Sequence, residues 1–491
     1  MSRPRISVSL WVSLLLAIVG PGMAGCTTNP ATGESSFTGL MSEADEVRIG
    51  RESHPQVLAE FGGAYADPEL DRYIDSLGQL LAHASDRPNL QYHFTVLDSP
   101  IVNAFATPGG YVYVTRGLLA LANSEAEVAG VLAHEIGHVA ARHAAERESQ
   151  AVLASIPGIF TGAVTGSDTL AQAVNSGAAA HLQSYSRDQE YQADLLGVRY
   201  LSRTNYDPLG MASFLAQLQA NDKLEAAEMD RPEMADQFSI MSTHPRTADR
   251  IQRAIQEAGG AQLANPITER DLYLSKIEGL RYGDEPEQGF IRDRQFLHPV
   301  MRFAFTVPAG FHMMNSADAV LAQRADGAAI LFSSTRKFTS ATAIAYLTDE
   351  WAPRLQMADA ETIDVNGLEA ATGSGQLELS SGVRDVRLVA VRLDSDTLMR
   401  FIFLTKPEQT GPLARDLQET TYSFRRLSPA EAARLHPQAI RIVTVRPGDS
   451  VAKLAAQMPF PDFREERFRV LNGLAATDRL TPGQHVKIIV E

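Results

Sequence analysis

The chain has 491 residues, 44% hydrophobic and 21% charged, which is a globular composition long enough for roughly two to four domains. Its formal net charge of −15 at pH 7, with no basic stretch to offset it, argues against nucleic-acid binding. The sequence contains neither a phosphate-cradling Gly-x-x-x-x-Gly-Lys motif nor a Gly-x-Ser-x-Gly nucleophile motif. P-loop and serine-hydrolase chemistry are therefore poorly supported.

The N-terminus predicts export. Arg3 and Arg5 precede an apolar run over residues 6–19 that is too short to span a membrane, and small residues follow it up to Cys26. We interpret residues 1–25 as a signal peptide. Cys26 is the only cysteine in the chain, and its setting resembles a bacterial lipobox, which implies lipidation. The alternative is an incidental cysteine beside an ordinary cleavage site.

By analogy with bacterial sorting, the residue after the lipidated cysteine indicates the destination. Thr27 stands there instead of an aspartate, which favours the periplasmic face of the outer membrane. The polar, turn-rich residues 26–41 are predicted to form a tether. The chain is thus expected to reach a membrane through a lipid anchor.

The first predicted folded domain covers residues 42–262, and it begins with scaffold elements. Helical patterns cover 42–61 and 67–85, and strand signals follow at 92–97, 102–106 and 111–115. A strand edge beside a metal can hold a substrate backbone in extended form. We assign that role to the hairpin over 103–114, with a plain sheet edge as an equal alternative.

The most informative stretch runs from Ser124 to His143 and contains His-Glu-x-x-His at 134–138. Ser124 and Glu127 form a capping-box start, and no proline follows until Pro157, so we predict one continuous helix. At about 100° per residue, His134 and His138 share one face and reach a single ion. Zinc suits two imidazoles, and an open coordination position lowers the pKa of a bound water to about 7.

Glu135 is one residue further round the helix, where a carboxylate can take a proton from that water and later give it to a leaving amine. The alternative is a helix that carries two histidines without a metal. The apolar residues around the motif make that costly, because unpaired buried histidines are unfavourable. They are Val128, Val131, Leu132, Ile136 and Val139.

A third ligand must come from another segment, and Glu190 is the best candidate. Glu190 and Asp194 are four residues apart on a predicted helix, so one carboxylate can bind metal while the other orients a ligand histidine. A solvated acidic face is the alternative. His143 is the nearest rival, but on a continuous helix it lies about 140° from the metal face, so we expect it on the surface.

Several ordered motifs resemble the gluzincin peptidase family that includes the CaaX prenyl protease and the heat-shock membrane protease. They are His134-Glu-Ile-Gly-His138, then Glu190-x-x-Ala-Asp194, then Thr243-His244-Pro245 with Arg250-Ile251, and Asn103-Ala-Phe-Ala-x-Pro-Gly-Gly-Tyr before the site helix. The likeness is greatest to soluble bacterial envelope members and covers about residues 29 to 259.

The resemblance implies one zinc ion per chain, held by His134, His138 and Glu190, with Glu135 as the general base. It implies further that Asp194 is an outer-sphere acid and that Arg250 supports the site. His244 matches a family histidine near the metal, where it either stabilises an oxyanion or binds zinc in a latent state.

Between the two ligand-bearing helices, residues 149–186 are rich in Ala, Gly, Ser and Thr. A gating lid, a packed helical hairpin and a lipid-touching surface are all compatible with this composition.

Residues 263–430 carry none of the catalytic motifs. Strand-like runs begin at 302–311 and recur at 319–323, 328–333, 374–379, 386–393 and 397–404, with helical stretches near 341–356 and 411–423. The pattern predicts an α+β domain with an antiparallel sheet. Its first run is faintly similar to the PsbP-like fold. We expect a recognition or interaction module, with a purely structural role as the alternative.

The last unit, 440–491, resembles a LysM domain. Pro447-Gly-Asp opens it, helical runs cover 451–457 and 463–471, Asn472-Gly473 follows, and a final strand covers 485–490. This β-α-α-β order implies binding of N-acetylglucosamine-containing glycans, which means peptidoglycan in a bacterial envelope.

The sequence therefore predicts a multidomain α+β protein: a mainly helical zincin-type domain with a small sheet, an antiparallel-sheet domain and a LysM-like domain. The leading hypothesis is a zinc metalloendopeptidase of the bacterial envelope that hydrolyses misfolded or stalled envelope polypeptides. The alternatives are a peptidoglycan-tethered chaperone or binding protein with a mostly latent metal site, and a peptidoglycan endopeptidase.

Overall fold

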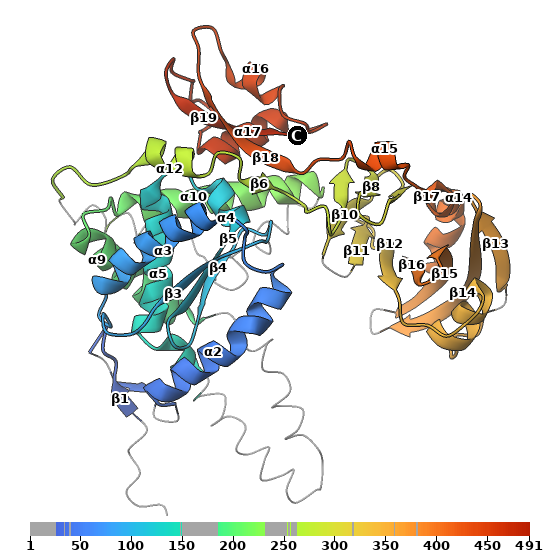
Figure 1. Ribbon diagram of the computed structural model, residues 1–491, viewed down its shortest axis with the longest axis horizontal. Coiled ribbons are helices and arrows are strands. Elements are labelled where there is room, and N and C mark those ends of the chain that lie inside the picture. Colours follow the sequence, from blue (N-terminus) through green and yellow to red (C-terminus); the bar gives the residue numbers. More distant parts are fainter. Residues whose placement is uncertain are drawn as a thin grey trace, which may run out of the picture. The chain divides into compact units, whose positions relative to one another are not determined.

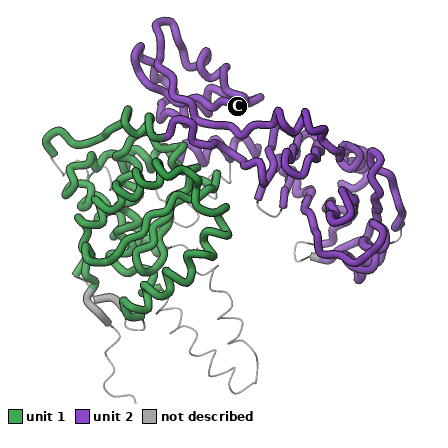
Figure 2. The backbone as a smooth tube through the Cα atoms, in the orientation of Figure 1, with its two compact units in different colours: residues 1–218, 239–276 green, residues 219–238, 277–491 purple. Residues whose placement is uncertain are grey.

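The computed structural model describes residues 26–33, 35–38, 41–147, 149, 185–230, 253, 256, 263–316, 319–357, 359–379 and 382–491. The chain divides into two compact units, residues 1–218 with 239–276 and residues 219–238 with 277–491 (Figure 2). Among the helices so described, none combines the length and apolar character that a membrane crossing requires. The predicted signal peptide and residues 150–184 of the segment between the two ligand-bearing helices lie outside the described residues.

The first unit is mainly helical around one small sheet (Figure 1). Its helices are α2 Glu43–Glu60, α3 Pro68–His83, α4 Arg116–Leu121, α5 Glu125–Ala140, α9 Arg187–Arg203 and α12 Arg270–Lys276, together with the first half of α10 Leu209–Glu228, whose residues from 219 on belong to the second unit. Helix α3 begins where Asp67 accepts hydrogen bonds from two backbone N–H groups of its first turn and Pro68 follows. Both helical patterns predicted at 42–61 and 67–85 are confirmed.

The small sheet has the order β3-β5-β4, with β3 His93–Leu97, β5 Tyr111–Thr115 and β4 Ala104–Thr107. β3 is parallel to β5, and β4 is antiparallel to it. Gly109 and Gly110 allow the β4–β5 turn because both have positive φ, 81° and 89°. β4 is an edge strand, yet all four of its residues are buried.

Part of the predicted tether is ordered against this unit. β1 Cys26–Thr28 pairs with β2 Ser35–Phe37 as an antiparallel hairpin. The Asn29 side-chain amide donates to the carbonyl oxygen of Ala141 at 2.9 Å. This contact satisfies a carbonyl just past the end of α5.

Helix α5 carries the His-Glu-x-x-His motif. Ser124 accepts a hydrogen bond from the N–H of Glu127, as the capping pattern predicted, and all sixteen residues of the helix are buried. The prediction of one continuous helix through His143 was wrong. The helix ends at Ala140, and Arg142 adopts a left-handed backbone with φ 59° before residues 143–147 resume helical structure.

A buried ion-pair network fixes that end of α5. Glu46 of α2 accepts hydrogen bonds from Arg87 at 3.1 Å and from Arg142 at 2.7 Å. Arg87 also donates to the carbonyl oxygen of Val139 at 3.1 Å. The guanidinium groups thereby satisfy a helix C-terminus and neutralise a carboxylate that is only 3% exposed.

The second unit contains an antiparallel sheet of seven strands in the order β10-β11-β12-β16-β15-β14-β13. The strands are β10 His312–Asn315, β11 Ala319–Gln323, β12 Ala329–Thr335, β16 Thr397–Thr405, β15 Gly382–Asp394, β14 Leu368–Leu379 and β13 Glu361–Val365. A four-stranded sheet contains β7 Phe290–Arg292, β8 Gln295–His298, β9 Phe303–Thr306 and β17 Arg425–Arg426. The predicted antiparallel α+β layer is confirmed.

Two apolar clusters cover the opposite faces of the seven-stranded sheet. One contains Phe332, Phe401, Phe403 and residues of helix α14 Pro407–Ser423. The other packs α13 Ala343–Ala345 and the π-helical turn η3 Tyr346–Trp351 against Val386, Leu388 and Ala390. The alternation of β15 side chains between the clusters explains why this strand is apolar on both faces.

Some strand predictions in this unit were incomplete. The run predicted at 302–311 ends as a strand at Thr306, before Pro308. The strands β6 Arg281–Tyr282, β7, β8, β10, β13 and β17 were not predicted. The predicted 374–379 strand is the second half of β14.

The C-terminal region has the predicted β-α-α-β order: β18 Gln438–Thr444, α16 Val451–Ala455, α17 Arg464–Asn472 and β19 His485–Val490. β18 pairs antiparallel with β19, and β6 Arg281–Tyr282 adds a third strand to β18. The short α15 Pro429–Ala432 precedes β18. Asn472 closes the motif because its side chain hydrogen-bonds the backbone of Lys487 through both its amide and its carbonyl oxygen.

Candidate metal centre

Close packing of α5 against α9 brings the two halves of the centre together. A side chain added at Gly137 would place its Cβ 3.0 Å from the carbonyl oxygen of Ala193, and one added at Gly197 would place it 3.3 Å from the backbone nitrogen of His134. The glycine inside the His-Glu-x-x-His motif and the alanine between Glu190 and Asp194 therefore set the helix separation. Larger residues at these contacts would push the two helices apart.

Three side chains from these helices converge on one point. The ligand atoms of His134, His138 and Glu190 all lie within 4.8 Å of one another, and all three residues are buried. The two Nε2 atoms are 3.1 Å apart, and the Glu190 carboxylate oxygens lie 3.7 Å from Nε2 of His134 and 3.5 Å from Nε2 of His138. No other such cluster occurs among the residues that the structure describes.

Each histidine is oriented by a partner on the other side of its ring. Nδ1 of His134 lies 3.0 Å from Oδ1 of Asp194. Nδ1 of His138 lies 2.9 Å from Nδ1 of His143, whose Nε2 is 3.1 Å from Oε1 of Gln192. The ring of Tyr185 stacks on His138 at a centroid distance of 3.9 Å. The sequence prediction that Asp194 stands behind a ligand histidine agrees with this geometry.

These contacts decide which nitrogen carries each proton. The carboxylate of Asp194 beside Nδ1 of His134 favours the tautomer with the proton on Nδ1, which leaves the Nε2 lone pair on the Glu190 side. Gln192 Oε1 accepts from Nε2–H of His143, so the Nδ1 of a neutral His143 accepts from Nδ1–H of His138. The lone pair of His138 Nε2 is then also directed toward Glu190.

Burial favours these neutral forms. It lowers the pKa of His138 well below its ordinary value of 6.5, and it lowers the pKa of His143 to about 4. Burial also raises the pKa of the Tyr185 hydroxyl to about 12, so this residue is un-ionised at neutral pH. His138 is therefore in the neutral form in which an imidazole binds a metal, and His143 is neutral beside it.

The donor set fits zinc. Two imidazole nitrogens and one carboxylate are typical zinc ligands, and a tetrahedron with bonds of about 2.0 to 2.1 Å has edges of about 3.3 Å. The three observed separations, 3.1, 3.5 and 3.7 Å, are close to that edge. In the tautomers described above, two imidazole lone pairs face each other at 3.1 Å in a buried site, and a cation between them would relieve their repulsion.

Glu135 is fully buried and follows the ligand His134 by one position on α5. The β4–β5 turn lies near His138, because Thr107, Pro108 and Gly109 line a cavity of about 10 Å³ together with His138 and Tyr185. The hairpin that we assigned to substrate binding is therefore adjacent to the ligand set. Its role in holding substrate stays a prediction.

The structure thus brings together His134, Glu135, His138, Glu190 and Asp194, whose individual roles stay predictions. His244 and Arg250 lie outside the described residues. The expectation that His143 is a surface residue was wrong: it is 0% exposed, because the left-handed Arg142 turns the chain back toward His138. Gln192 and Tyr185 were missed as well, and only the spacing of Gln192 from Glu190 and Asp194 on one helix gave any signal.

The fold and the donor set define a metallopeptidase domain of the His-Glu-x-x-His class. Residues 68–258 match the model of peptidase family M48, and residues 443–488 match that of the LysM domain. The first segment is thus similar to peptidase family M48, whose members use zinc, and the second is similar to LysM domains.

Individual relatives agree with this assignment. The chain is 29% identical over 290 residues to the beta-barrel assembly-enhancing protease of Escherichia coli (strain K12), covering 57% of each chain. It is 29% identical over 221 residues to the mitochondrial metalloendopeptidase OMA1 of Schizosaccharomyces pombe, covering 42% of this chain and 59% of that one. The chain thus spans less than two thirds of these relatives.

Among solved structures, the cyanobacterial PsbP of Synechocystis aligns with a TM-score of 0.22 and 14% identity, covering 29% of this chain and 98% of that one. This likeness is too low to carry an argument, so the faint PsbP-like resemblance stays a prediction.

We predict that His143→Ala weakens metal binding about 10- to 100-fold, because His138 loses the acceptor that fixes its tautomer. His143→Asn, whose side-chain oxygen can accept the same proton, should restore part of the affinity. Zinc affinity is measured by competition with a chromogenic chelator. His83→Ala, at an exposed histidine of α3, is the control, and equal affinity in all variants would contradict the assigned role.

Proposed function

We propose that this chain is a zinc-dependent metalloendopeptidase of the bacterial cell envelope. The observation that carries the proposal is the buried convergence of His134, His138 and Glu190 within 4.8 Å, in a domain similar to peptidase family M48. When bound there, zinc supplies a Lewis acid that polarises a peptide carbonyl and lowers the pKa of a water molecule.

The side chains of the site then divide the work. Asp194 and His143 hold the two imidazoles in the tautomers that direct Nε2 to the metal. Glu135 takes the proton of the attacking water and delivers it to the leaving amine. Its complete burial excludes bulk solvent, which strengthens its electrostatic contact with the reacting groups. His244 is assigned to the oxyanion of the tetrahedral intermediate or to a latent state, and Arg250 to support of the site, on the family resemblance alone.

The substrates are polypeptides. We propose that they are misfolded or stalled envelope proteins, a role supported by the name of the Escherichia coli relative, which describes an enhancer of β-barrel assembly. The hairpin β4–β5 is assigned to hold the substrate backbone in extended form beside the metal.

Two attachments would keep the enzyme in the envelope. Cys26 is proposed to carry a lipid that anchors the chain to the periplasmic face of the outer membrane. The LysM domain is proposed to bind peptidoglycan, since domains of this family recognise N-acetylglucosamine-containing glycans.

Glu135→Gln should lower kcat for casein hydrolysis about 10²- to 10⁴-fold while the zinc content stays near one per chain, because the substitution removes a proton acceptor but no ligand. Glu190→Ala, in contrast, should lose the metal. Activity and metal content are measured on the same preparations. Full activity in Glu135→Gln would refute the mechanism.

The lipid anchor is tested by partitioning. The native protein should enter the detergent phase of Triton X-114 after expression in a bacterial host that processes lipoproteins, whereas Cys26→Ser should remain in the aqueous phase because it has no acceptor thiol. An aqueous native protein would argue for the incidental cysteine.

The glycan interaction is tested by sedimentation with purified sacculi. The full chain should pellet with sacculi, and chitin oligomers should displace it because they present the same N-acetylglucosamine units. Recovery in the supernatant at every sacculus concentration would contradict peptidoglycan binding.

A further inference from the structure

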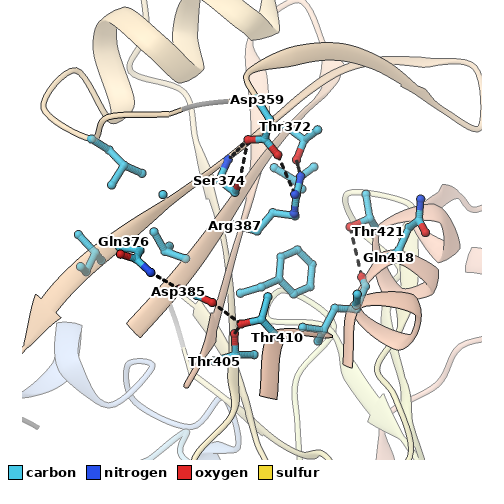
Figure 3. A pocket seen from close by; sticks show the side chains of 18 of the residues that line it. Asp359, Thr372, Ser374, Gln376, Asp385, Arg387, Thr405, Thr410, Gln418 and Thr421 are labelled. Carbon is cyan, nitrogen blue, oxygen red and sulfur yellow. Dashed lines mark hydrogen bonds and ion pairs between the residues drawn. The ribbon is translucent and has the colours of Figure 1, made fainter. Parts of the chain in front are cut away.

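A large groove lies in the second unit, far along the sequence from the metal ligands. It has a volume of about 1080 Å³ and is bounded by one face of α14 and by strands β13 to β16 (Figure 3). On the helix, the lining positions Thr410, Ala414, Leu417, Gln418 and Thr421 have helical spacing and share one face. This volume is at the upper end of the range for ligand pockets, and it is larger than the volume of most metabolites.

The strand side of the groove includes the sheet face that carries Thr372, Arg387 and Val389, and it continues around the β14 edge to Gly375 and Leu377, whose side-chain positions belong to the opposite face. On β14 and β15 the cross-strand pairs are Thr372 with Val389, Ser374 with Arg387, and Gln376 with Asp385. The floor is apolar because Val389 and Phe403 form it. Both side chains are nearly buried, at 1% and 2% exposed.

Two hydrogen-bond networks border this apolar floor (Figure 3). In the first, Asp359 accepts from Ser374 and from Arg387, and Arg387 also donates to Thr372 at 3.1 Å. In the second, Asp385 accepts from Gln376 at 2.9 Å and from Thr410 at 2.6 Å. These networks hold the polar rim in place around an apolar centre, which is the usual layout of a binding site.

Next to the groove, β14 has an edge that its neighbour does not cover. β13 pairs with β14 only from Leu368 to Thr372, whereas β14 continues to Leu379. The two-residue turn Asn366–Gly367 makes Val365 and Leu368 a hydrogen-bonded pair, so the even-numbered residues of β14 direct their N–H and C=O groups to the β13 side.

Within the described residues, the first position on that edge beyond the ladder is capped by a side chain. Asp359 Oδ1 accepts the N–H of Ser374 at 2.6 Å. Gln376 and Glu378 follow with the same orientation, and no described strand pairs with them on this side. Such an edge accepts an added strand through main-chain hydrogen bonds.

The chemistry of the lining selects among ligand classes. Its charged residues are Arg354, Asp359, Glu361, Asp385 and Arg387, three acids against two arginines, and both Asp359 and Asp385 already accept hydrogen bonds within the groove. An anion such as a phosphate would find no surplus positive charge. An extended polypeptide satisfies the open main-chain groups and can place an apolar side chain on the floor.

We propose that this groove binds an extended segment of the polypeptide substrate, which adds as a strand beside Gln376 and Glu378 and seats an apolar side chain over Val389 and Phe403. The identity of the ligand as substrate rests on the proposed peptidase function. The groove would thus hold the polypeptide substrate at a second site while the metal centre cleaves that polypeptide.

The test uses the full chain carrying Glu135→Gln and loaded with zinc, with fluorescein-labelled β-casein as an unfolded probe in an anisotropy titration. Ala414→Trp fills the groove and should raise the Kd about tenfold or more, the loss expected when an apolar anchor is displaced. Arg415→Trp is the matched control, because this neighbouring side chain is 87% exposed and does not line the groove. It should leave the Kd within about twofold.

Amide hydrogen exchange in the chain without a groove substitution gives a second, independent measurement of binding. β-Casein should slow amide exchange in the segment 374–379 of the native fold but not in Ala414→Trp. Thermal melting establishes that both tryptophan variants are folded. Equal Kd values for Ala414→Trp and Arg415→Trp, or unchanged exchange at 374–379, would overturn the proposal.

The outcome is separable from that of the proposed function. Casein binding that depends on Ala414 in a chain that cleaves nothing would support the groove and refute the peptidase. Casein cleavage with an unaltered KM in Ala414→Trp would support the peptidase and refute the groove. If both proposals hold, Ala414→Trp should raise the KM for casein while its kcat/KM for a short fluorogenic peptide matches that of Arg415→Trp.

Discussion

The chemistry of this protein depends on the close approach of helices α5 and α9. Gly137 and Ala193 meet with almost no side-chain volume between them, and this contact places a carboxylate from one helix beside two imidazoles from the other. Ion binding would then stabilise the folded state by mass action, because the unfolded chain lacks the preformed site. The helix contact, the metal and the stability of the first unit are therefore coupled.

The residues around the predicted metal ligands explain how the buried histidines are kept in the orientation that metal binding needs. Asp194 lies beside Nδ1 of His134, and His143, itself held by Gln192, lies beside Nδ1 of His138. Burial keeps His138 and His143 neutral. The Glu46–Arg87–Arg142 network fixes the point where α5 ends, and the turn at Arg142 returns His143 to the site. The ion pairs of Glu46 thus position His143, which contacts the predicted metal ligand His138.

The sequence predicted the parts of this site that follow from regular geometry. His134 and His138 are four residues apart, so they share one face of a helix, and Ser124 marked the start of that helix. Glu190 was predicted from the spacing of two acids and from the family resemblance, because no local pattern states which distant helix faces the motif. His143 could not be placed, since a single left-handed residue, Arg142, invalidates a helical-wheel argument. The short β13 and the open edge of β14 were missed because pairing partners are set by tertiary structure.

The most direct test of this account is a crystal structure of the native full chain, with anomalous diffraction recorded on both sides of the zinc absorption edge. The account predicts one zinc peak bonded at about 2.0 to 2.2 Å to Nε2 of His134, Nε2 of His138 and a carboxylate oxygen of Glu190. It would be contradicted by an absent peak in protein purified without chelator, or by a zinc ion held elsewhere while these three side chains point apart.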